Sequence, residues 1–108
     1  MLTIKKDVLF QKDYRIAEDV SIFEYALANA SEIDASAPIA VVSADNSYLE
    51  LNLSGAIIYE GIEKGEELQT LCSKFTQLFG LNSDRAKESI ILFFSKLIEK
   101  GIIEEKND

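Results

Sequence analysis

The feature that most constrains the fold is the run Leu-Asn-Leu-Ser-Gly-Ala-Ile-Ile-Tyr at residues 51–59. The residues that lead into it alternate between polar and apolar side chains, which is typical of a half-buried strand. Asn52 or Ser54 then supplies a side-chain oxygen that caps the first turn of a helix. The run therefore predicts a junction at which a strand ends and a helix begins.

A β-hairpin is predicted just upstream of this junction. Residues 39–42 and 48–51 have strand-like composition, and the segment between them contains an aspartate and an asparagine, which tolerate turn dihedrals. In the second strand Leu49 and Leu51 point to one face, while Tyr48 and the glutamate that follows Leu49 point to the other. One face of the hairpin is therefore expected to lie on the core.

Three amphipathic helices are predicted after the hairpin, because apolar residues recur at helical spacing and each pattern ends at a glycine. Strands followed by helices indicate an α+β fold, winged-helix-like, with an N-terminal β-hairpin or three-stranded sheet packed on three helices. The helices are expected at residues 52–62, ended by Gly61 or Gly65, at 66–79, ended by Gly80, and at 82–100, ended by Gly101.

The N-terminal third of the sequence is harder to interpret. Residues 8–11 are a strand candidate. Residues 20–27 mix β-branched and aromatic side chains, which favours extended structure, although their apolar residues also fall at helical spacing. We expect extended structure there, followed by a loop over 30–36. The chain is then one domain, with an arm at residues 1–38 and a winged-helix body at 39–108.

Composition restricts the class of partner. With 19 acidic and 11 basic residues in 108, the chain has a net charge of −8, which disfavours nucleic acid and anionic membranes. The same charge favours neutral or basic peptides. No segment has the length of a membrane helix or the pattern of a signal peptide. A single cysteine, Cys72, excludes an internal disulfide, so we expect a cytoplasmic protein.

The sequence offers no catalytic machinery. There is no histidine, so the usual metal sites, haem sites and Ser-His or Cys-His pairs cannot be built, and the glycines form no phosphate-binding loop. We therefore expect no metal, no cofactor and no enzymatic activity. Glutamates at positions 60, 63, 66 and 67 are interpreted as a solvated helix end and turn.

The third predicted helix has an unusually wide apolar sector. With successive residues about 100° apart, the sector spans roughly 160°, and one edge of it carries Lys87, Ile91, Phe94 and Ile98. One packing face requires less than that. Either this helix is sandwiched between two elements, or one flank lines a groove for a partner.

The order and spacing of these motifs resemble the PqqD-like family of RiPP recognition elements over residues 39–104. Residues 51–59 are similar to the family's Leu-Asn-x-x-Gly-Ala-x-Ile-Trp pattern, with Tyr59 at the tryptophan position. Residues 79–86 are similar to its Tyr-x-Val-x-x-Glu-x-Ala stretch, and 93–103 to Phe-Leu-x-x-Leu-x-x-x-Gly-Leu-Ile. The segment 13–37 departs from the family, because it is longer and less strand-like.

The resemblance implies a non-enzymatic peptide chaperone. Members of this family hold the leader segment of a ribosomally made precursor peptide for a modifying enzyme, often a radical SAM protein. Strand addition to an open sheet edge is the expected mode of binding. By analogy the edge is residues 48–52 and the opposite wall is the third helix. The peptide-binding residues are then Tyr48, Leu49, Glu50, Leu51, Asn52, Lys87, Ile91, Phe94 and Ile98.

Two alternatives remain at this stage. A winged-helix transcription regulator would present the start of the third helix to DNA, but two acids there oppose phosphate binding. A structural domain that dimerises through the same strand edge is the other, so monomer and homodimer both remain open. The DNA-facing residues would be Ser83, Asp84, Arg85, Lys87 and Glu88.

Overall fold

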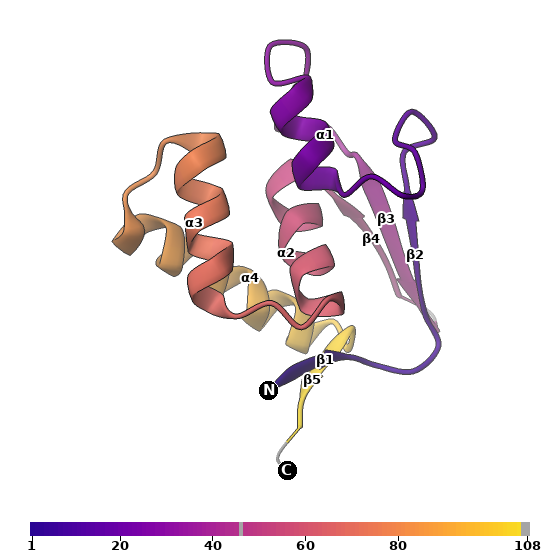
Figure 1. Ribbon diagram of the computed structural model, residues 1–108. Coiled ribbons are helices and arrows are strands. Elements are labelled where there is room, and N and C mark those ends of the chain that lie inside the picture. Colours follow the sequence, from indigo (N-terminus) through magenta and orange to yellow (C-terminus); the bar gives the residue numbers. More distant parts are fainter. Residues whose placement is uncertain (46, 107–108) are drawn as a thin grey trace.

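A three-stranded antiparallel sheet forms one side of the molecule. The computed structural model describes residues 1–45 and 47–106. Strand β3 (Ala40–Ala44) pairs with β2 (Val8–Lys12) on one side and β4 (Ser47–Leu51) on the other, in the order β2-β3-β4. Figure 1 shows this sheet along one side of the helices. The predicted hairpin and the strand candidate at 8–11 are confirmed, and β2 and β4 are the two edges of the sheet.

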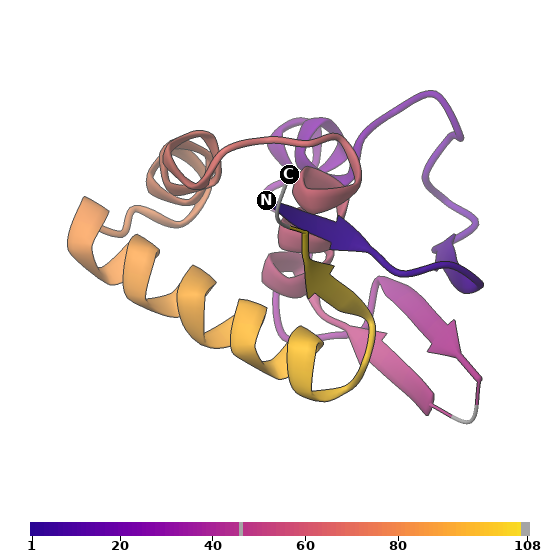
Figure 2. The same ribbon diagram turned by 90° about the horizontal axis from the view of Figure 1, so that it is seen from below.

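A second, two-stranded sheet joins the two ends of the chain. Strand β1 (Leu2–Ile4) pairs antiparallel with β5 (Ile103–Glu105), so that segments from opposite ends of the sequence lie side by side (Figures 1 and 2). This pairing of β1 with β5 was not predicted. Short segments at opposite ends of a sequence carry no local signal that they pair.

The three predicted helices are present, and local capping chemistry sets their ends. Asn52 accepts a hydrogen bond from the backbone of Gly55 at 3.0 Å and begins the first of them. Gly80 and Gly101 adopt positive φ where the second and third end, and Gly65, not Gly61, does so after the first. The helices are α2 (Leu53–Glu63), α3 (Leu68–Phe79) and α4 (Ser83–Glu99).

The N-terminal segment contains a fourth helix, α1 (Ile22–Ala28), where extended structure was predicted. That prediction was wrong. Ser21 caps the helix, since its side chain accepts a hydrogen bond from the backbone of Glu24 at 3.1 Å. Ile22 and Ala26, one turn apart, are completely buried. The sequence signal was the pair of Ser21 and Glu24, a capping pattern that outweighs the β-propensity of the segment. The loop expected over 30–36 is confirmed.

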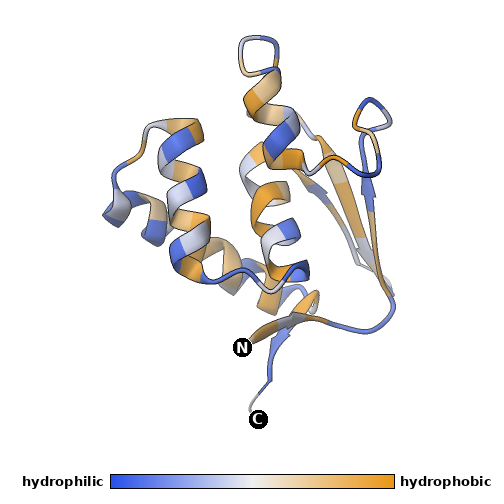
Figure 3. Ribbon diagram, in the orientation of Figure 1, coloured by the Kyte–Doolittle hydropathy of each residue, from blue (hydrophilic) through white to orange (hydrophobic). Residues whose placement is uncertain are grey.

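Helix α2 is the centre of the core, buried on nearly every side between the sheet, α1, α3 and α4. Figure 3 shows apolar residues along it and on the adjoining strands. Tyr59 stacks on Phe10 of β2 with ring centroids 4.5 Å apart. Gly61 faces Leu71 so closely that an added Cβ would lie 2.4 Å from that side chain. The fold is therefore α+β as predicted, with a three-stranded sheet and four helices.

Candidate functional site

The outer edge of β4 is open. Strand β4 has β3 on one side, and within the described residues no strand pairs with its other side. Along β4, Leu51 is buried and Leu49 is half-buried against the core, whereas Tyr48 is 66% exposed and Glu50 is exposed. An edge strand of this kind presents unpaired backbone N–H and C=O groups, to which another extended chain can pair.

A hollow of about 370 Å³ lies at the end of this edge, where β4 passes into α2. Glu50, Leu51 and Asn52 border it on the strand side, and Phe93 and Lys96 of α4 border it on the helix side. A Cβ built on Gly55 would lie 2.8 Å from the Phe93 ring. Glycine in the first turn of α2 therefore allows α4 to approach this closely, and it sets the Phe93 ring in the hollow.

Exposed side chains of α4 continue this wall. Leu92 is 66% exposed, and Lys96, one turn later, is exposed at the hollow. Among the described residues Lys96 has no carboxylate within ion-pair distance. The hollow beside β4 thus has an aromatic ring and an ammonium group on its helix side, and the exposed Leu92 lies one turn before Lys96 on the same helix. Sequence reasoning missed all three; the glycine in the first turn of α2 was the only signal of this close approach.

The α4 residues expected to form this wall lie on the opposite flank of the helix. Lys87 borders a hollow of about 730 Å³ between α3 and α4. Phe94 borders another of about 320 Å³, together with Leu2 and Leu68. Ile91 and Ile98 lie on the same helical row, 43% and 47% exposed. The structure therefore places residues 48–52 along the β4 edge, whereas Lys87, Ile91, Phe94 and Ile98 lie on the flank of α4 that borders the other two hollows.

The reason for this difference in placement is geometric. A helical pattern gives the width of an apolar sector, but not which of its two edges faces a given neighbour. The exposure of Ile91 and Ile98 also shows that this flank is not sandwiched between two elements.

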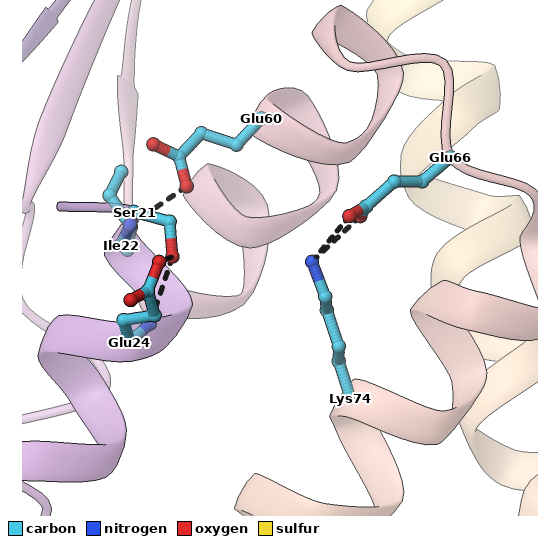
Figure 4. A network of polar contacts seen from close by, with 6 residues as sticks. All are labelled: Ser21, Ile22, Glu24, Glu60, Glu66 and Lys74. Atoms are coloured by element: carbon cyan, nitrogen blue, oxygen red, sulfur yellow. Dashed lines mark hydrogen bonds and ion pairs between the residues drawn. The ribbon is translucent and has the colours of Figure 1, made fainter. Parts of the chain in front are cut away.

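A polar network holds α1 in place at some distance from this site (Figure 4). Glu60 is only 7% exposed, and its carboxylate accepts a hydrogen bond from the backbone N–H of Ile22 at 2.8 Å. Lys74 pairs with Glu66 at 2.7 Å and lies 5.2 Å from the centre of the Phe23 ring. Glu60 and Glu66 are therefore structural groups and not the solvated residues that were predicted.

The titration shifts in the structure also have structural causes. A hydrogen bond from the Arg15 side chain lowers the pKa of Asp13, and one from Ser36 lowers that of Asp34. Burial raises the pKa of Tyr59 to about 12, with a smaller contribution from the charge of Glu63. Residues 1–45 and 47–106 contain no group of three His, Cys, Asp or Glu side chains placed to hold a metal ion. No helix in the same residues has the length and apolar character needed to cross a membrane.

The fold and site define a small α+β domain with an open edge strand beside a long helix. The family model described as Coenzyme PQQ synthesis protein D (PqqD) matches residues 39–103, and the chain belongs to this family. The predicted resemblance is thereby confirmed.

A solved structure described as TbiB1 in complex with the TbiA(beta) leader peptide is similar to the whole chain. Its TM-score is 0.66 at 15% sequence identity, with 98% of this chain and 99% of that chain covered. The shared fold therefore includes the N-terminal segment that lies outside the family model. No curated protein matches the sequence.

Proposed function

We propose that this protein captures the leader segment of a ribosomally synthesised precursor peptide by adding it to the sheet as a strand beside β4. The observation that carries the proposal is the open edge of β4, with the Phe93 and Lys96 hollow next to it. Two further observations support it. The chain belongs to the PqqD family, and the similar TbiB1 structure is described as a complex with a leader peptide.

The geometry suggests how affinity and selectivity divide between backbone and side chains. Backbone hydrogen bonds to β4 hold any extended segment, while alternate side chains of the peptide point toward α4. Each buried apolar side chain contributes about 1.5–3 kcal/mol, which is comparable with the ~1–2 kcal/mol cost of fixing the backbone of one residue. Selectivity therefore depends on how well those alternate side chains fit against Phe93 and Lys96.

The protein's role in this proposal is to hold and present the peptide. Chemistry is left to a separate modifying enzyme, for which a radical SAM protein is a candidate. The sequence has no histidine, and the serine hydroxyls at the hollow, those of Ser36 and Ser54, donate to Asp34 and Asn52 in a local turn and a helix cap, so we assign binding to this site.

The test begins with peptides selected from a random display library on the immobilised full-length protein. Each selected peptide is then titrated into isotopically labelled protein and followed by NMR. We expect the amides of β4 and the side chains of Phe93 and Lys96 to shift, and the outward amides of β4 to gain protection from hydrogen exchange. N-methylation of the alternate peptide amides that face β4 is expected to abolish binding, because those N–H groups donate to the strand. N-methylation of the other alternate set, which faces away from β4, is expected to leave binding intact.

Two outcomes would contradict the proposal. Shifts confined to the hollow between α3 and α4 would place the peptide on the other flank of α4, near Ile91. Equal tolerance of both N-methylation phases would exclude strand addition. Light scattering on the free protein serves as a control, because a homodimer that uses the β4 edge would have to dissociate before the peptide binds.

A further inference from the structure

The flank of α4 that faces β4 is basic, although the chain as a whole carries a net charge of −8. Phe93 marks this flank, because its ring contacts Gly55 and borders the hollow. At about 100° per residue, Lys96, Lys100 and Arg85 all lie within about 80° of Phe93, on the same side. The nearest acidic residue of α4 on that side, Glu99, is about 120° away.

The side chains of these basic residues form no ion pairs with the described part of the chain. The ion pairs within the described residues join Arg15 with Asp13 and Lys74 with Glu66. Lys96 is exposed and borders the hollow together with Glu50 of β4, and no ion pair joins the two side chains. A lysine in this position is available to a ligand.

We propose that the segment captured beside β4 carries an acidic side chain on the face directed toward α4, and that Lys96 binds it, with Lys100, one turn later, adding to the positive charge. The proposal rests on the proposed function, because it assigns the chemistry of the peptide that the β4 edge takes. It also specifies which of the two alternating sets of peptide side chains carries the acidic residue. That set faces Phe93, and the other set lies beside Glu50.

The net negative charge of the protein does not oppose this preference. Charges more than about 8 Å away are largely screened at physiological ionic strength, so the ammonium group in the hollow outweighs the remote carboxylates. Glu50, which borders the same hollow, disfavours further acidic residues of the peptide there. The expected ligand is therefore a segment with an acidic residue at one defined position, and not a uniformly acidic one.

The experiment compares selections from one random peptide display library on three full-length proteins: the unmodified chain, Lys96→Glu and Lys6→Glu. Lys6 is exposed and precedes β2, at the opposite edge of the sheet, so its reversal changes net charge equally without touching the hollow. We expect Asp or Glu to be enriched at one position among peptides selected on the unmodified chain and on Lys6→Glu. On Lys96→Glu the preference at that position is expected to change to Lys or Arg.

Titrations then give the magnitude. Lys96→Met is expected to weaken the best acidic peptide about two- to five-fold and to have no effect on the same peptide with Asn or Gln at the acidic position. Because Lys96 is exposed, Lys96→Met is expected to leave the melting temperature nearly unchanged. Lys96→Glu is expected to lower it slightly, because Lys96 lies in the last turn of α4, where the helix dipole favours a cation.

The outcomes separate the two proposals. Peptides that bind the β4 edge but show no acidic preference, or the same preference on Lys96→Glu, overturn the charge assignment and leave strand capture standing. Failure to select any peptide that perturbs β4 overturns strand capture, and the charge assignment with it.

Discussion

Tyr59 illustrates how a single residue joins the helices to the three-stranded sheet. It lies on α2, is 1% exposed, and stacks on Phe10 of β2 at 4.5 Å. Tyrosine in this position fills the core like any aromatic residue, but it also places a titratable hydroxyl where its anion is poorly solvated. Burial accordingly raises its pKa to about 12 from an ordinary value of 10.0.

A pH dependence follows from this shift. Because the folded-state pKa lies above the unfolded one, the associated stability is present in full below pH 10 and is lost as the pH rises toward 12. We expect the free energy of unfolding to fall by about 2 kcal/mol over that interval on account of Tyr59. Urea denaturation between pH 9 and pH 12 measures it, with Tyr59→Phe as the comparison. An equally steep decline in Tyr59→Phe would contradict this assignment.

Residue-level chemistry was predictable where it is local. The caps at Asn52, Gly80 and Gly101 act on backbone within a few residues, so the sequence specifies them directly. Glu60 was misread because its partner, Ile22, is 38 residues away. The position of Phe93 at the hollow was missed for a similar reason. Its approach to Gly55 depends on how α4 packs on α2.

At the scale of elements, α1 depends on a small number of contacts with α2 and α3. Ile22 and Ala26 supply its apolar face, and the Glu60 carboxylate accepts from its first backbone N–H. A carboxylate at a helix N-terminus is favoured by both the free N–H groups and the helix dipole. Such a short helix is marginal in isolation, so these contacts determine whether α1 is formed.

Glu60→Ala is therefore expected to loosen α1 selectively. Loss of a buried, charge-assisted hydrogen bond costs about 2–3 kcal/mol, because the N–H of Ile22 is left without a partner. Native-state hydrogen exchange is expected to show faster exchange at α1 amides than at those of α4. Glu63→Ala, an exposed position on the same helix, is the matched control and is expected to change stability by less than about 0.5 kcal/mol. Uniform acceleration across all helices would instead indicate that α1 has no separate opening.

At the scale of the whole molecule, the N-terminal segment contributes a strand to each of the two sheets. Residues 1–38 supply β1 to the terminal sheet and β2 to the main sheet, and they supply α1 to the helical layer. The predicted division into an arm at 1–38 and a body at 39–108 was placed where the resemblance to the PqqD-like family begins. The family model begins at the same residue, 39, but the core does not divide there.

The fragment 39–108 is therefore expected not to fold on its own, even though it contains the entire family match. Deleting residues 1–38 removes Ile16, Ile22 and Ala26 from the core. It also removes the half-buried Phe10, which stacks on Tyr59. At about 1.5–3 kcal/mol for each large apolar side chain, the loss approaches the ~5–15 kcal/mol by which a typical domain is stable.

Circular dichroism and the dispersion of amide resonances test this expectation on the fragment. We expect little cooperative thermal unfolding from 39–108 alone. Adding a synthetic peptide of residues 1–38 is expected to restore cooperativity, because it returns a partner strand to both β3 and β5. A fragment that unfolds cooperatively near the melting temperature of the full chain would show instead that residues 1–38 are an appendage. In such a folded fragment, which lacks β2, strand β3 would also have an open edge. A captured peptide could then add beside either β3 or β4.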